Sequence, residues 1–127
     1  MDTFSSNIVP VEVFMSVICG AYIARNPVPR VNMEYINRCH GLGAATQGRS
    51  QFNPLFLAQL QHHLWSGNAF ATYMAPGSSA NTWRYRITYN PAYVITGVNG
   101  ETGQPCHAMN YIIHYDSFTI INAFPAI

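Results

Sequence analysis

The sequence predicts an α+β fold in which N-terminal helices pack on a twisted, mostly antiparallel β-sheet. In the first half, apolar residues recur at helical spacing, whereas from Asn68 onward short runs of β-branched and aromatic residues alternate with turn clusters. A length of 127 residues is usual for one domain. We therefore expect a single domain over residues 1–127, mainly helical at 1–67 and mainly sheet at 68–127.

The first half contains three candidate helices. An apolar stripe within Val11 to Arg25 predicts a helix that Asn26-Pro27-Val28-Pro29 terminates. A second, short helix is expected over Arg30 to Cys39. The third begins at Asn53-Pro54, a good N-cap followed by a residue suited to the first helical position, and ends before Gly67.

The second half contains five candidate strands. They are Ala69 to Ala75, Thr82 to Tyr89, Ala92 to Val98, Ala108 to Tyr115 and Phe118 to Phe124. The last two are the most apolar, so we place them in the centre of the sheet. In the strand Thr82 to Tyr89, large apolar side chains alternate with Thr and Arg. One face should therefore be core, and the other should present Arg84 and Arg86, which together can bind an anionic substrate.

Composition narrows the possible functions. Charged residues make up 9% of the chain and the net charge is +1, so the broad basic field of a general nucleic-acid binder is missing and any RNA site must be local. All six basic residues are arginine. The absence of lysine excludes both a Schiff-base lysine and a Walker phosphate loop.

Neither a metal, a cofactor nor a membrane anchor is expected. The chain has three cysteines without CxxC spacing, which disfavours a disulfide framework and a zinc knuckle. His62 and His63 are adjacent on a predicted helix, so they point about 100° apart and cannot chelate one metal by themselves. The apolar run Val11 to Ala24 is interrupted by Glu12 and is too short to span a bilayer.

The glycine-punctuated segment Cys39 to Pro54 carries the first candidate site, formed by His40 and Arg49. A histidine can take a proton from a ribose 2′-hydroxyl near neutral pH, and an arginine can neutralise phosphate oxygens in the transition state. A polar group from the last strand can fix the scissile phosphate. This combination suits metal-independent transesterification at a phosphodiester.

Five features occur in the order found in a known family: a histidine beside glycine, an arginine in the following loop, a polar pair before phenylalanine, a helix and a closing strand. They are His40-Gly41, Arg49, Ser50-Gln51-Phe52, the helix with Ala58 and Leu60, and Ile121-Asn122-Ala123-Phe124-Pro125. Over about Tyr35 to Ile127 the chain resembles the RNase A-like domain at the tip of bacterial contact-dependent growth-inhibition and related polymorphic toxins.

This resemblance implies an RNase A-like fold and a cleft that cuts RNA without metal. It would make His40 the general acid or base and Arg49 the phosphate binder, with the family's terminal Thr-x-Tyr positions at Asn122 and Phe124. Phe124 lacks the hydroxyl, and Asn122 cannot take a proton. The implied partners are an RNA, such as tRNA, and a cognate immunity protein. The implied location is that of a secreted or delivered effector acting in the target-cell cytoplasm.

The length of the turn at Asp116-Ser117 decides which further residue lies beside Asn122 in the candidate site. A two-residue turn pairs Tyr115 with Phe118 and puts Tyr111 beside Asn122, as a substrate-binding group. A three-residue turn aligns His114 with Asn122, as a second acid or base. Asp-Ser is not a favoured two-residue hairpin turn, which favours the longer turn and His114.

Two other classes of function remain open. An ADP-ribosyltransferase or NAD-cleaving toxin would use Arg84 or Arg86 on the dinucleotide phosphates, but Glu101 is the only glutamate in the second half. A non-catalytic protein-binding module would use strand aromatics such as Trp83 and Tyr111 as its surface.

Overall fold

The computed structural model describes residues 8–10, 14, 17–18, 29–40, 49–63, 70–89 and 94–127. Its helices are α3 (Met33–His40), α4 (Pro54–Ala58) and α5 (Leu60–His63). Its strands are β1 (Ile8–Pro10), β2 (Arg30–Val31), β3 (Gln51–Phe52), β4 (Phe70–Pro76), β5 (Thr82–Thr88), β6 (Gly97–Val98), β7 (Pro105–Cys106), β8 (Ala108–His114) and β9 (Thr119–Ala126).

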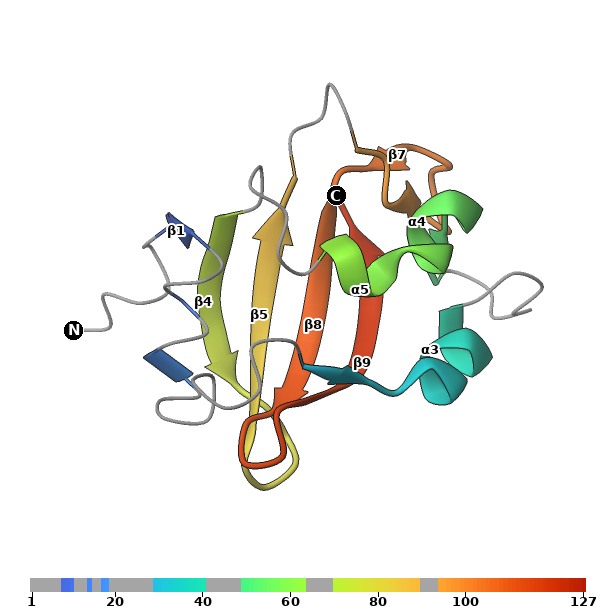
Figure 1. The fold of residues 1–127 in the computed structure, drawn as a ribbon. Helices are drawn as coiled ribbons and strands as arrows, with labels where there is room; N and C mark the ends of the chain where they lie inside the picture. Colours follow the sequence, from blue (N-terminus) through green and yellow to red (C-terminus); the bar gives the residue numbers. More distant parts are fainter. Residues whose placement is uncertain are drawn as a thin grey trace.

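The strands form a six-stranded sheet and a three-stranded sheet (Figure 1). The larger has the order β1-β4-β5-β8-β9-β2, and the smaller has the order β3-β6-β7. Among these strands β2 and β9 pair in parallel, and the other pairs are antiparallel. The predicted α+β class, with a mostly antiparallel sheet, is confirmed.

Two of the expected elements have different bounds in the structure, and a third cannot be compared over most of its length. Val11 to Arg25 lies largely outside the described residues, of which Phe14 and residues 17–18 are helical. The helix expected from Arg30 begins at Met33 instead, because Arg30 and Val31 pair with β9 and Asn32 Oδ1 accepts the N–H of Tyr35. Within the described part of the expected strand Ala92 to Val98, only Gly97 and Val98 are extended in a sheet.

The helix start at Asn53 is confirmed. The Asn53 side chain accepts the backbone N–H of Leu55 at 2.9 Å, and Pro54 occupies the first turn. The helical segment is then interrupted at Gln59, so α4 and α5 are two short helices rather than one. Residues 64–69, where the helix was expected to end, lie outside the described part.

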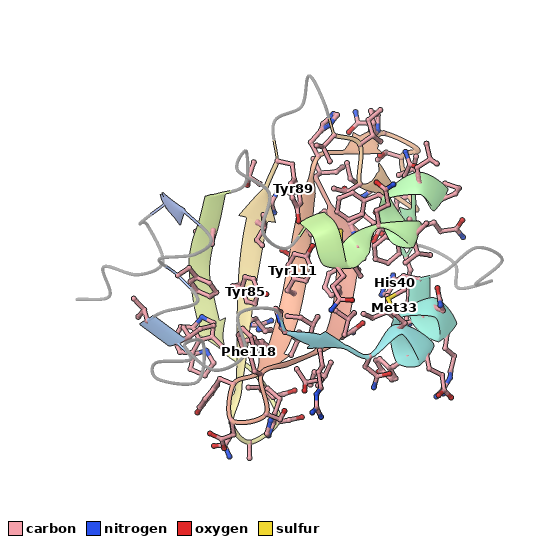
Figure 2. All side chains as sticks on the ribbon, in the orientation of Figure 1. Met33, His40, Tyr85, Tyr89, Tyr111 and Phe118 are labelled. Carbon is pink, nitrogen blue, oxygen red and sulfur yellow. The ribbon has the colours of Figure 1, made fainter. Side chains whose placement is uncertain are left out.

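The hydrophobic core lies on the face of the large sheet that α4 and α5 cover (Figure 1). Tyr85, Tyr89 and Tyr111 project from this face (Figure 2). The ring of Phe56 meets Tyr89 edge-on at a centroid distance of 5.4 Å, which ties α4 to the sheet. Burying such aromatic rings contributes most of the driving force for packing helix on sheet.

The opposite face of the large sheet carries the predicted arginines. Two rows of residues cross β5, β8 and β9 on this face. One row consists of Arg84, Ile112 and Asn122. The next row consists of Arg86, Asn110 and Phe124. We call these six residues the arginine face. The predicted alternation along β5 is confirmed from Arg84 onward, since Tyr85 and Ile87 are buried whereas Arg84 is exposed; at the start of the strand, however, Thr82 is buried and Trp83 is half-buried.

Candidate active site beside His40

His40 ends α3 and points toward β9 (Figure 2). Its ring stacks on Phe124 of the arginine face, with centroids 5.1 Å apart and planes inclined by 23°. Its Nδ1 lies 2.9 Å from the carbonyl oxygen of Ser50. Since a carbonyl only accepts, Nδ1 must carry the proton, and in the neutral ring Nε2 keeps a lone pair.

The surroundings of His40 favour the neutral, basic form of the ring. The side chain is 7% exposed. This burial lowers the pKa of His40 below its ordinary value of 6.5; the hydrogen bond to Ser50 opposes the shift, and the nearby charge of Arg49 adds to it. At neutral pH the ring can therefore accept a proton at Nε2. Arg49, exposed and close enough to act on that pKa, supplies positive charge beside it.

The smaller sheet holds the segment that carries Arg49 and the Ser50 carbonyl. Gln51 pairs with Val98, so the preceding residues run along the β6–β7 hairpin. A Cβ added to Gly100 would lie 2.0 Å from the carbonyl oxygen of Arg49. Only glycine allows that approach, so the hairpin fixes the position of this segment by direct backbone contact.

The arginine face continues from His40 across the sheet. Arg84 and Arg86 lie on β5, on the same side as Asn122 and Phe124 on β9. The Arg86 guanidinium donates to the backbone oxygen of Ile127. Strands β4, β5, β8 and β9 contain no Asp or Glu. The face is therefore locally positive although the chain as a whole is nearly neutral.

Asn122 lies on the arginine face, two residues before Phe124. Its Oδ1 accepts the backbone N–H of Ala123 at 2.9 Å, so its amide hydrogens point elsewhere. The side chain lines a pocket together with Tyr35 and Asn32 at the start of α3. The structure thus gathers His40, Arg49, Asn122 and Phe124 on one side of the large sheet.

The last hairpin combines the two predicted registers: next to the turn it keeps the register of the two-residue alternative, and beyond an irregularity Asn122 comes to share a face with Ile112 and His114. The turn spans residues 115–118, so His114 pairs with Thr119 rather than with Asn122. An irregularity between Ile112 and Ile113 then shifts the register by one, which pairs Asn122 with Ile112. Such a bulge inserts one residue and reverses which side chains share a face.

His114 lies on the same face as Asn122 but away from His40 along β8, whereas Tyr111 lies on the opposite face. His114 lies four residues along β8 from Asn110, which pairs with Phe124; this spacing corresponds to about 13 Å. Its Nδ1 is 2.8 Å from Ser117 Oγ in the turn. Tyr111 is 0% exposed and lies on the core face, where its hydroxyl is 2.8 Å from that of Tyr89. This position excludes Tyr111 from any surface that a substrate reaches.

Three contributors to this site were missed from the sequence. The role of Ser50 rests on its carbonyl, which every residue possesses, so no sequence signal exists for it. Asn32 and Tyr35 were placed within the expected helix from Arg30. An asparagine three residues before Tyr35 is an N-cap signal that would have moved the helix start and revealed both.

The described part of the chain contains neither a metal-binding cluster nor a membrane-spanning helix. Within it, no three His, Cys, Asp or Glu side chains are placed to hold a metal ion. None of the helices described is long and apolar enough to cross a bilayer.

Comparisons with protein-family models, with characterised proteins and with solved structures find no significant match. The chemistry of the site therefore has to be argued from its own residues.

Proposed function

We propose that this chain is a metal-independent ribonuclease toxin with an RNase A-like fold, and that its active site is centred on His40. The observation that carries the proposal is the position of His40, hydrogen-bonded to the Ser50 carbonyl and stacked on Phe124. The family resemblance assigned His40 and Phe124 to one cleft, and they are in contact.

The reaction follows from the protonation state of His40. Nε2 takes the proton of a ribose 2′-hydroxyl, and the 2′-oxygen attacks the adjacent phosphorus. The bond from phosphorus to the 5′-oxygen breaks, and that oxygen takes a proton from water; the hydroxide left behind takes the proton from Nε2, which restores the neutral ring. Arg49 offsets the extra negative charge of the five-coordinate phosphorane. The products are a 2′,3′-cyclic phosphate and a free 5′-hydroxyl.

Arg84 and the arginine face would hold the RNA backbone leading to His40. Their positive charge is local, in agreement with a chain whose net charge is +1. A delivered effector of this kind requires a cognate immunity protein in the producing cell, and the immunity protein would cover His40 and this face. The proposed site of action is the cytoplasm of the target cell.

Product chemistry tests the proposal. Purified protein is incubated with an RNA oligonucleotide and with the DNA oligonucleotide of the same sequence, and the fragments are analysed by mass spectrometry. We expect 2′,3′-cyclic phosphate ends on the RNA and no cleavage of the DNA, which lacks the 2′-hydroxyl. Cleavage of the DNA, or RNA fragments with 5′-phosphate ends, would reject this mechanism. Consumption of NAD with intact RNA would indicate the NAD-cleaving class instead.

A further inference from the structure

A pocket of about 300 Å³ opens on the arginine-face side of the sheet, between the start of α3, the β4–β5 turn and β9. Its lining consists of Asn32, Tyr35, Ser78, Ser79, Thr82, Ile112, Ile121 and Asn122. The volume is at the lower end of the range for small-molecule sites, so the pocket suits a ligand the size of a nucleoside.

The lining suits a neutral planar ring. None of the described residues that line the pocket carries a charge, which gives a phosphate or a metal ion little to bind there. Ile112 and Ile121 supply an apolar surface, and the half-exposed Tyr35 adds an aromatic ring at the rim. Stacking against apolar and aromatic side chains is how proteins commonly hold a nucleobase.

Among the described residues, hydrogen bonding leaves the amide donors of the two asparagines free for a ligand, whereas the Thr82 hydroxyl, whose proton goes to Ser79, offers only an acceptor. Backbone N–H groups only donate, so the bonds from Tyr35 N–H to Asn32 and from Ala123 N–H to Asn122 occupy the amide oxygens. In the described part of the chain, neither Nδ2 group has an internal partner. The Thr82 hydroxyl donates to the carbonyl of Ser79 at 2.7 Å. Both asparagines therefore offer N–H groups to a ligand.

We propose that this pocket binds uracil or guanine of the RNA substrate, the bases with a carbonyl (O4 or O6) where cytosine and adenine carry an exocyclic amino group. The asparagine N–H groups can donate to that carbonyl, whereas the exocyclic amino groups of adenine and cytosine would face another donor. The inference rests on the proposed function for its link to catalysis. Asn122 and Phe124 are two residues apart on one strand, about 7 Å, so the pocket adjoins the partner of His40.

Binding of free nucleosides tests the pocket without any need for catalysis. Uridine, guanosine, adenosine and cytidine are titrated into the ¹⁵N-labelled wild-type protein, and the side-chain amide signals of Asn32 and Asn122 are followed by NMR. We expect uridine or guanosine to shift both signals, with affinity about 5- to 30-fold above that of adenosine and cytidine. No shift with any nucleoside, or equal affinity for all four, overturns the proposal.

An isosteric variant links the pocket to cleavage. Asn32→Asp keeps the oxygen that caps Tyr35 but replaces the donor by an acceptor. Asn99→Asp is the matched control, because the Oδ1 of Asn99 also accepts backbone N–H groups, from Glu101 and Thr102, in the β6–β7 turn.

We expect Asn32→Asp to lose the preference for keto bases and Asn99→Asp to keep it. If both variants cleave RNA with the wild-type preference, the pocket proposal fails and the ribonuclease proposal stands. If the wild type binds uridine or guanosine but leaves RNA intact, the pocket stands and the ribonuclease proposal fails.

Discussion

The imidazole of His40 stacks on the ring of Phe124 at a centroid distance of 5.1 Å, which joins the end of α3 to the last strand of the sheet. Together with the hydrogen bond from Nδ1 to the Ser50 carbonyl, this contact fixes the plane and the tautomer of the ring. We therefore expect the ring stack to contribute to stability and to the proposed catalysis.

Removing the aromatic ring of Phe124 should weaken the site. Phe124→Leu loses the stack, worth about 1 kcal/mol beyond simple burial, and leaves His40 less well oriented. We expect kcat for RNA cleavage to fall about tenfold, with a small drop in melting temperature. Phe124→Tyr keeps the ring and adds the hydroxyl that the resemblance to the toxin domain would place here, so its kcat should equal or exceed that of wild type. A Phe124→Tyr variant as impaired as Phe124→Leu would contradict this role for the stack.

The depressed pKa of His40 predicts how stability depends on pH. In the folded chain the pKa lies below the ordinary value of 6.5, so just below pH 6.5 the unfolded chain binds the proton more readily. The free energy of unfolding should therefore fall as the pH decreases from 6.5 through the folded pKa. Urea denaturation at pH 7.5 and 5 should show a smaller loss for His40→Gln than for wild type. An equal loss in His40→Gln would show that His40 does not titrate in this way.

The close contact between Gly100 and Arg49 predicts a specific loss of activity. Gly100→Ala places a methyl group against the Arg49 carbonyl and should displace the segment that carries Arg49 and Ser50. Gly103→Ala is the control in the same hairpin, because the added methyl group would meet no atom within 4 Å. Gly103 has a φ of +72°, so alanine there costs about 1 kcal/mol in backbone strain. We expect both variants to lose stability and only Gly100→Ala to lose kcat. Equal kcat in the two variants would show that the β6–β7 hairpin does not position Arg49 and Ser50 for catalysis.

An exposed arginine on the sheet should contribute to RNA binding through charge. Arg84→Gln is expected to raise KM several-fold and to reduce the salt dependence of binding by about one phosphate contact. Arg38→Gln removes the same charge from α3, where Arg38 is paired with Glu34 at 3.2 Å, and should change KM little. Fluorescence anisotropy with a labelled RNA at several salt concentrations measures both. The same salt slope in Arg84→Gln and wild type would exclude Arg84 from the binding surface.

Local sequence patterns predicted much of this fold, whereas features set by long-range geometry could not be predicted from them. The alternation in β5 placed Arg84 on the open face, and the capping residue Asn53 located the start of α4. The register of the last hairpin depended on a four-residue turn in which buried Phe118 has a φ of 51°, and on a bulge near Ile112. No local propensity marks either feature, so His114 and Tyr111 were assigned to a site that they do not reach.

The role of His40 in catalysis can be tested against a second histidine that makes the same kind of contact. His40 Nδ1 bonds to the Ser50 carbonyl, and His107 Nδ1 bonds to the Val94 carbonyl at 2.8 Å. Wild type, His40→Ala and His107→Ala are incubated with total RNA in EDTA. We predict that the wild type and His107→Ala degrade the RNA and that His40→Ala does not. Intact RNA with the folded wild type, or degradation by His40→Ala at the wild-type rate, would contradict the account.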